Sequence, residues 1–283
     1  MDELTQRYLR QQIELGGAEL VMGETRGRGD DGPTIESART QRNDIIAPGQ
    51  GTASVAPRPR IDRLAASRPS KDWRAGAPPI PGPGLLIEAP AIDLLSKRGR
   101  EWNSLDEVHG EIAHCRKCFL CEGRKNVVPG EGSARAEMVF VGEGPGQTED
   151  ETGRPFVGRA GELLTDILGA LGLTREQVFI CNAVKCRPPQ NRKPLPDEMA
   201  ACHPYLEAQL ALIRPKVIVA LGATAAEALL QTRRSLADLR GKVHSYHGIP
   251  LIVTYHPAAL LRNPNWKKPT WDDVRIARQL IDR

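Results

Sequence analysis

The chain has 283 residues and a formal net charge of +4, which permits binding to nucleic acid without arguing for it. No apolar run approaches the roughly 20 residues of a membrane span, and the N-terminal stretch lacks the apolar core of a secretory signal. A membrane-spanning protein is therefore not expected. We predict a soluble, cytoplasmic protein.

The first third of the chain differs in composition from the rest. Residues 1–22 have a loose apolar face and predict a short helix, either a tethered element for an unidentified protein partner or a mobile arm. Residues 23–95 are rich in Gly, Pro, Ala, Ser and Arg and cannot bury enough apolar surface to offset their ordering entropy. We predict a disordered linker there, in a monomeric protein whose folded domain spans residues 96–283.

Strand and helix patterns alternate through this domain. A capping-box pattern at Ser104 and Glu107 predicts a helix that runs into Cys115. Strands are predicted at 137–142, 178–184, 216–221 and 250–255, and helices at 160–171, 196–212, 223–230 and 270–282. Because β and α alternate, we predict an α/β fold, a three-layer α/β/α sandwich around a central, mostly parallel four-stranded sheet.

The first of these strands ends in a glycine-rich turn. An apolar run from Met138 to Val141 is followed by GEGPG at 142–146, and ligands bind at the carboxyl ends of parallel strands. Three acidic residues come next, and then Phe156 in a loop braced by Gly and Pro. The pattern is neither a dinucleotide fingerprint nor a P-loop. It predicts the edge of a pocket, with an incidental βα turn as the other interpretation.

Two polar residues end strands at the same predicted edge, Asn182 and His256. The Asn182 amide has a donor and an acceptor side by side, which matches the edge of a pyrimidine, although such an amide is also a common structural hydrogen bonder. The basic loop at 185–194 suits phosphate contacts or is a solvated surface loop. Leu260 and Leu261 lie on a predicted turn, which favours a wedge between bases; the other interpretation packs both leucines beneath the loop.

All six cysteines lie between Cys115 and Cys202, which favours a metal site over disulfides in a chain without an export signal. The first two form a C-x2-C pair, and Cys186 and Cys202 come from two further segments. Four such thiolates suit structural zinc or an iron–sulfur cluster, and the C-x15-C spacing of the second pair favours the cluster. Cys121 and Cys181 are spare, and Cys181 is predicted to be a small core residue. The other interpretation is six unliganded thiols.

Together these motifs resemble one family, the family 4 uracil-DNA glycosylases, the iron–sulfur branch of their superfamily. The resemblance covers about residues 112–283 and is carried by GEGPGxxED, TGRPFVGRAG, CNAVKCRPPQNRKPLP and HPAALLRNP, in the order of the family. It implies a uracil-DNA glycosylase-like fold and a [4Fe–4S] cluster. The implied cluster ligands are Cys115, Cys118, Cys186 and Cys202.

The resemblance also implies roles at the sheet edge. Phe156 would stack on a flipped uracil, and Asn182 would recognise its Watson–Crick edge. The remaining implied roles are catalysis by Glu143 and His256, shaping of the pocket by Gly142 and Gly144, and insertion of Leu260 into the gap left in the duplex. Apart from the resemblance, the basic loop predicts DNA contact by Lys185 and Arg192, and the position of Arg262 beside the leucines predicts a further one. Whether Glu143 orients water or only braces its loop stays open, with water positioning favoured.

The resulting prediction is a monofunctional uracil-DNA glycosylase that acts on uracil-containing DNA and starts base-excision repair. A base inside a duplex is unreachable, so the nucleotide must flip out at a cost of a few kcal/mol. His256 would then donate to the uracil carbonyl as negative charge develops there. Two other hypotheses stay open: a metal-stabilised DNA-binding protein without activity, and a glycosylase for another deaminated base.

Overall fold

The computed structural model of the chain describes residues 72–87 and 102–282. The predicted helix at 1–22 and most of the predicted linker lie outside the described residues. The strands are β1 (Pro83–Ile87), β2 (Glu131–Gly132), β3 (Met138–Gly142), β4 (Phe179–Asn182), β5 (Val217–Leu221), β6 (Val243–Tyr246) and β7 (Ile249–Thr254). The helices are α2 (Leu105–His114), α3 (Leu120–Gly123), α4 (Gln147–Thr152), α5 (Arg159–Ala170), α6 (Pro196–Ile213), α7 (Ala223–Leu230), α8 (Leu236–Leu239), α9 (Pro257–Arg262) and α10 (Lys267–Ile281), with short 3-10 turns at η1 (Pro189–Asn191) and η2 (Pro264–Trp266).

The four predicted strands are adjacent and parallel at the centre of one sheet, whose order is β1-β6-β7-β5-β3-β4-β2. The prediction of a mostly parallel sheet is therefore confirmed, but the count of four strands is wrong because the described residues form seven. The three unpredicted strands lie towards the edges, where β6 pairs antiparallel with β7 and β2 pairs antiparallel with β4. These strands lack the continuous apolar run that marks a strand buried on both faces.

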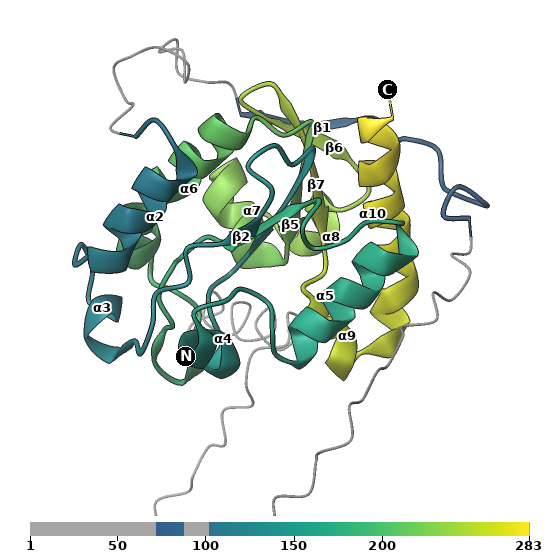
Figure 1. Cartoon of the computed structure of the whole chain (residues 1–283). Helices are drawn as coiled ribbons and strands as arrows, with labels where there is room; N and C mark the ends of the chain where they lie inside the picture. The colour runs from purple at the N-terminus through teal and green to yellow at the C-terminus, as the bar shows by residue number, and fades with distance from the viewer. Residues whose placement is uncertain (1–71, 88–101, 283) are drawn as a thin grey trace, which may run out of the picture. The chain divides into compact units, whose positions relative to one another are not determined.

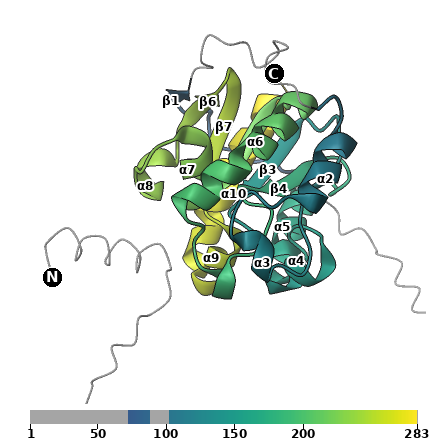
Figure 2. The ribbon, with the colours of Figure 1, turned by 90° about the vertical axis from the view of Figure 1, so that its left-hand side faces the viewer.

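Helices cover both faces of the sheet, as Figures 1 and 2 show. Along β3, Val139 and Val141 pack in a cluster with residues of α6 and α7, whereas Met138 and Phe140 pack in a second cluster with residues of α5 and α10. This alternation follows from the two-residue period of a strand. The three predicted layers are therefore present. None of the helices in the described ranges has the length and apolar character that crossing a membrane requires.

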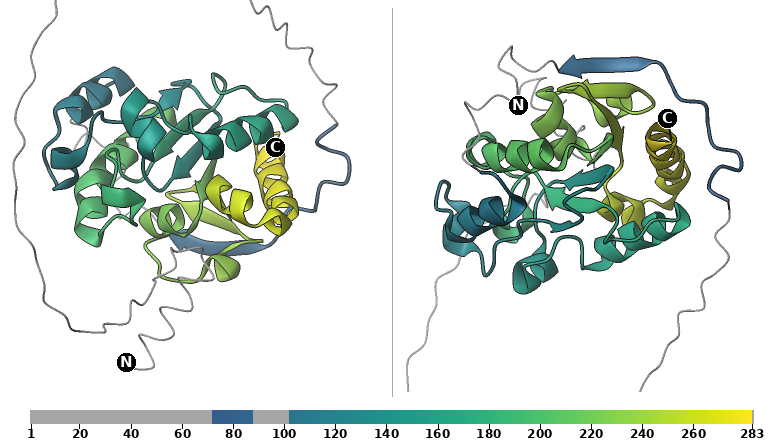
Figure 3. Two further views of the ribbon diagram at one scale, coloured as in Figure 1. Left: turned by 90° about the horizontal axis from the view of Figure 1, so that it is seen from below. Right: turned by 45° about the horizontal axis from the view of Figure 1, so that its top comes forward.

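The helix ends agree with the local sequence signals. Ser104 caps α2, since its hydroxyl accepts a hydrogen bond from the Glu107 backbone N–H at 3.2 Å. Four short helices were not predicted: α3, α4, α8 and α9. The segment 257–262, predicted as a turn, is α9, and Pro257 occupies its first turn. Figure 3 (left) looks at the end of the molecule where α4 and α9 lie.

The prediction of a disordered linker is wrong for residues 72–87, which pack on the domain. β1 pairs parallel with β6, and the Leu85 backbone N–H donates to His244 Nδ1 at 2.9 Å. Trp73 is buried in a cluster with Leu171 and Val274. Composition averaged over 23–95 conceals this short segment, because one tryptophan and one five-residue strand are enough to hold it.

We expect Trp73→Ala to lower the free energy of unfolding by about 3 kcal/mol, because a buried aromatic is replaced by a cavity. For a domain of this size the melting temperature should fall by about 6–12 °C. Leu86→Ala is the matched control, since Leu86 lies on the same segment with 66% of its surface exposed. Thermal unfolding followed by circular dichroism measures both. Equal melting temperatures for wild type and Trp73→Ala would contradict the packing described here.

Candidate active site

The carboxyl ends of the four central strands meet at one edge of the sheet and supply the candidate site. β3 leads into the turn after Gly142, β4 ends at Asn182, and the chain beyond β7 reaches His256. Gly142 and Asn182 are directly paired across the sheet. The prediction that these motifs share one sheet edge is confirmed.

Gly142 allows an aromatic ring and an amide to meet. A Cβ atom on Gly142 would lie 2.4 Å from Asn182 Oδ1 and 2.5 Å from Phe156 Cζ, closer than real Cβ contacts. The Asn182 side chain is 1% exposed, and its Oδ1 has no hydrogen-bond partner among the described residues. An unpaired buried acceptor costs about 1–3 kcal/mol, so this oxygen is placed to receive a donor from a ligand.

Phe156 is held in an unusual backbone conformation. Its φ of 51° lies in the left-handed region, which costs a residue other than glycine roughly 1–2 kcal/mol. Its ring is buried, and the ring centroid lies 5.5 Å from that of His256. Gly161 in α5 permits this arrangement, because a Cβ there would lie 1.8 Å from the Phe156 carbonyl oxygen. Gly161, the last residue of TGRPFVGRAG, is therefore required by the loop that carries Phe156.

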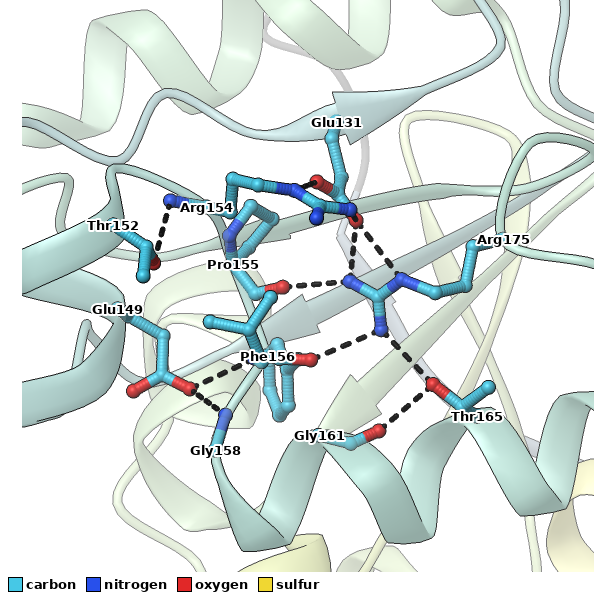
Figure 4. Close-up of polar contacts among 11 residues, drawn as sticks. Glu131, Glu149, Thr152, Arg154, Pro155, Phe156, Gly158, Gly161, Thr165 and Arg175 are labelled. Carbon is cyan, nitrogen blue, oxygen red and sulfur yellow. Dashed lines mark hydrogen bonds and ion pairs between the residues drawn. The ribbon is translucent and has the colours of Figure 1, made fainter. Parts of the chain in front are cut away.

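Glu149 joins the glycine turn to the aromatic loop, and Figure 4 shows its contacts with the loop. One carboxylate oxygen accepts from the backbone N–H groups of Val157 and Gly158, each at 2.9 Å, and the other accepts from Gly146 at 3.1 Å. The sequence showed three consecutive acids without separating them. The neighbouring Asp150 is buried and accepts from the Lys125 backbone N–H instead. In the sequence, only the position of Glu149 three residues after Gly146 could have indicated this role.

His256 has a defined tautomer. Its Nδ1 accepts a hydrogen bond from the Ala258 backbone N–H at 3.1 Å, so in the neutral ring the proton is on Nε2. Burial, together with the nearby Arg262 charge, lowers the pKa of His256 to about 4. The ring is therefore neutral near pH 7 and carries one N–H, on Nε2.

Glu143 contacts the first turn of α7. Its Oε2 accepts from the Thr224 hydroxyl at 2.5 Å, and Thr224 is buried. Burial raises the pKa of Glu143, although the Thr224 hydrogen bond and the charge of Lys193 oppose the shift. The contact of Thr224 with Glu143 was not predicted, because the two residues are 81 positions apart in the sequence. This contact orients the carboxylate.

Five thiols line one cavity beside this site. They come from the end of α2, the segment around α3, the loop after β4, and α6: Cys115, Cys118, Cys121, Cys186 and Cys202. The predicted convergence of distant segments is confirmed, and Cys181 is buried in the core as predicted. Cys121, predicted to be spare, also lies at the cavity.

The thiols receive hydrogen bonds and face cations. Arg124 donates to Cys186 Sγ at 3.1 Å, and the Lys185 backbone N–H donates to Cys202 Sγ at 3.3 Å. Burial raises the pKa of Cys202 to about 12. No group of three or more His, Cys, Asp and Glu side chains within 72–87 and 102–282 is arranged to hold a metal ion. The donor set of this cavity is nevertheless all thiol, and four thiolates are the donors that hold an iron–sulfur cluster.

Two residues predicted to contact DNA are buried instead. Lys185 is 1% exposed, and its Nζ donates to the Asn182 carbonyl at 2.8 Å and to Gln209 Oε1 at 2.7 Å. The Lys185 side chain points into the interior beyond the end of β4 and does not extend from the basic loop into solvent. The predicted phosphate contact is therefore wrong. Leu260 is buried because helix α9 turns it inward, whereas Leu261 is 40% exposed. The predicted presentation of Leu260 to solvent is therefore wrong.

The other two predicted DNA contacts differ in their surroundings. Arg262 is exposed at the end of α9. Arg192 forms a two-pronged ion pair with the buried Glu198, at 2.6 and 2.8 Å. Neither arrangement tests a contact with DNA, so both stay predictions.

The comparisons with known proteins agree with this geometry. The family model described as the uracil DNA glycosylase superfamily matches residues 129–277, more than half of the chain. This α/β/α domain, with its candidate site at the carboxyl ends of the central strands, therefore belongs to that superfamily.

Individual relatives narrow the assignment. A type-4 uracil-DNA glycosylase of Sulfurisphaera tokodaii is 48% identical over 63% of this chain and 85% of its own length. One from Thermotoga maritima is 46% identical, over 63% of this chain and 95% of its own length. A type-5 uracil-DNA glycosylase of Thermus thermophilus is 36% identical over 46% of this chain and 68% of its own length. The chain is a member of the type-4 family, which confirms the resemblance found in the sequence.

Proposed function

We propose that this protein is a uracil-DNA glycosylase that flips uracil out of DNA and hydrolyses its N-glycosidic bond, leaving an abasic site for base-excision repair. The observation that carries the proposal is the unpaired Asn182 Oδ1 beside the Phe156 ring in a member of the type-4 family. Uracil has an N3–H that could donate to this oxygen, and its flat ring could stack on the phenyl ring.

The same acceptor supports discrimination against cytosine. Cytosine has a lone pair at N3 where uracil has N–H, so the Asn182 oxygen would stay unpaired and face another acceptor. Sites built to pair with a polar group reject analogues that cannot make that pair. The Lys185 contact to the Asn182 carbonyl fixes the backbone from which the amide extends.

Breaking the glycosidic bond leaves negative charge on the uracil. The His256 Nε2–H is fixed by the Nδ1 contact and would donate to the O2 carbonyl as this charge develops. Glu143, oriented by Thr224, would position the attacking water and accept its proton. No residue needs to form a covalent bond to the sugar, so we expect ordinary turnover.

The first test is release of uracil from a labelled oligonucleotide with one central uracil, compared with cytosine at the same position. Release of uracil alone supports the proposal. Tight DNA binding without release of either base would instead favour a DNA-binding protein that keeps the fold. Competing hypoxanthine and thymine substrates test the third hypothesis, a glycosylase for another deaminated base.

We further propose that four thiolates hold a [4Fe–4S] cluster in the cavity beside the site. All-thiol donors with N–H groups directed at sulfur fit such a cluster. When bound, the cluster would supply cross-links between segments far apart in sequence. The ligands we propose are Cys115, Cys118, Cys186 and Cys202. The monomeric state, the cytoplasmic location and a partner for residues 1–22 stay predictions.

We expect Cys202→Ala to lose most of its iron and sulfide, because Cys202 is buried and is the one cavity thiol that α6 carries. Iron and sulfide analysis and the visible absorption of the purified protein measure this. Cys181→Ala is the matched control, since Cys181 is also buried but lies in the core. Full iron content in Cys202→Ala would contradict the ligand assignment, and zinc in the wild type would contradict the cluster.

The rate of uracil release should fall as the pH decreases through the raised pKa of Glu143, above its ordinary value of 4.5. His256 stays neutral down to about pH 4 and should not contribute to this loss. Single-turnover rates between pH 4.5 and 8 measure the profile, with circular dichroism to confirm folding. Glu143→Gln should be slower and lack this acid limb. An unchanged limb in that variant would exclude Glu143 as its source.

A further inference from the structure

The Phe156 loop needs a support that its own sequence does not provide. Phe156 adopts left-handed backbone angles, and its neighbours Pro155 and Val157 are not glycines. Glu149 holds the N–H groups that follow Phe156. The carbonyl groups on the other side of the loop must be held by a different residue.

Arg175, in the loop between α5 and β4, holds both carbonyls (Figure 4). Its Nη1 donates to the Phe156 oxygen at 3.0 Å and to Thr165 Oγ1 at 3.2 Å. Its Nη2 donates to the Pro155 oxygen at 2.6 Å and also to Glu131, and Nε donates to Glu131 at 2.9 Å. A guanidinium group has five N–H donors, and all five are used here. None is left for a phosphate group of DNA.

Glu131 connects this clamp to the base-recognition strand. It lies in β2, which pairs antiparallel with β4, and Glu131 is opposite Ile180, two residues before Asn182. The Glu131 and Arg175 side chains are only 21% and 14% exposed, so their ion pair is shielded from water. Arg175 and Glu131 therefore hold the Phe156 loop on β2, the strand that pairs with the strand carrying Asn182.

We propose that Arg175, anchored by Glu131, is a positioning residue that holds the Phe156 ring in register with the Asn182 amide, so that a flipped pyrimidine meets both. The inference rests on the proposed function, because Phe156 must serve as the stacking surface. Arg175 touches neither base nor DNA backbone. It acts through the two carbonyls that it holds.

A double-mutant cycle on the single-turnover rate of uracil release tests the proposal. We expect Arg175→Ala to slow release by about thirtyfold to a hundredfold, as for a misplaced contact group, while DNA affinity changes by less than about twofold. Phe156→Ala should slow release by about a hundredfold through lost stacking. The double variant should be no slower than Phe156→Ala, because both changes remove the same surface.

Arg278→Ala is the matched control. Arg278 is comparably buried, with 19% exposure, and among the described residues it pairs with Asp282 and lies over the Trp73 ring, not against the Phe156 loop. Its rate should stay within about twofold of wild type. If Arg175→Ala does not fold, Arg175→Lys takes its place in the cycle. Lysine keeps the charge beside Glu131 but has one nitrogen for two carbonyls, so about tenfold slower release is expected.

A wild-type rate in the folded Arg175 variant would overturn this inference alone. Additive losses in the double variant would overturn it as well, because Arg175 would then act independently of Phe156. A wild-type rate in Phe156→Ala would overturn the proposed stacking surface and this inference together. These results separate failure of the clamp from failure of the site.

Discussion

Uracil release should fall about a thousandfold in an Asn182→Asp variant, and release of cytosine should appear. The wild-type amide oxygen has no partner within the described residues and is placed to accept from uracil N3–H. An ionised aspartate has only acceptors, so it loses the amide donor that would pair with a uracil carbonyl. Its oxygens can instead accept from the exocyclic amino group of cytosine. Buried groups left unpaired account for discrimination of this size.

The measurement is single-turnover release of each base from oligonucleotides that carry uracil or cytosine opposite guanine. Asn103→Asp is the matched control, because it adds the same charge at an exposed position before α2. That variant should release uracil at the wild-type rate and leave cytosine untouched. Unchanged uracil release by Asn182→Asp would show that another residue recognises the base.

His256→Ala should slow uracil release by about a hundredfold to a thousandfold, the usual effect of removing one fixed donor to developing negative charge. Alanine also removes the Nδ1 contact to the Ala258 N–H, which could loosen α9. His256→Asn separates the two effects. Asparagine can cap the Ala258 N–H but lacks the imidazole Nε2–H, so it should be about as slow as alanine while retaining stability.

Rates at saturating enzyme and thermal unfolding should be measured for each of these variants. His203→Ala is the matched control, since His203 pairs with Glu207 on α6, one of the helices that pack on the sheet. It should release uracil normally. A His256→Asn variant with the wild-type rate would show that the imidazole donor is not needed for bond cleavage.

The sequence predicted the centre of the fold because the central strands are continuous apolar runs. β3 and β5 are buried at every position, and an apolar run of this kind can be recognised as a strand from the local sequence alone. β2 has two residues, and β6 alternates half-buried and buried positions with His244 on its inner side. Strands of this kind form only because a neighbour is already present, so local sequence carries little signal for them.

The candidate site was predictable to the extent that it depends on strand ends. Gly142, Asn182 and His256 follow strands, and parallel strands deliver their carboxyl ends to one edge. Contacts between distant side chains were not predictable. Arg175 reaches the Phe156 loop from 19 residues away, and the contact of Thr224 with Glu143 spans 81 residues.

The two wrong predictions of exposure have a common origin. Lys185 and Leu260 were judged from their exposed neighbours in sequence, yet each side chain turns inward. Lys185 continues the buried end of β4, and Leu260 lies on the inner face of an unpredicted helix. To predict that a side chain is exposed, one must know which side of its helix or strand faces the core. The spacing of apolar residues in the sequence shows this only for long helices and strands.

The pairing of β1 with β6 also bears on how the protein behaves in concentrated solution. β1 uses N–H and C=O groups along one side of β6, including the bonds from Val243 to the Gly82 carbonyl and from His247 to the Ile87 carbonyl. A strand with such groups uncovered is a template on which another chain can add. A chain shortened to begin after Ile87 would present that template at every molecule's edge. Its preparations should therefore associate and precipitate at concentrations where the full chain stays dispersed, even if its chemistry is intact.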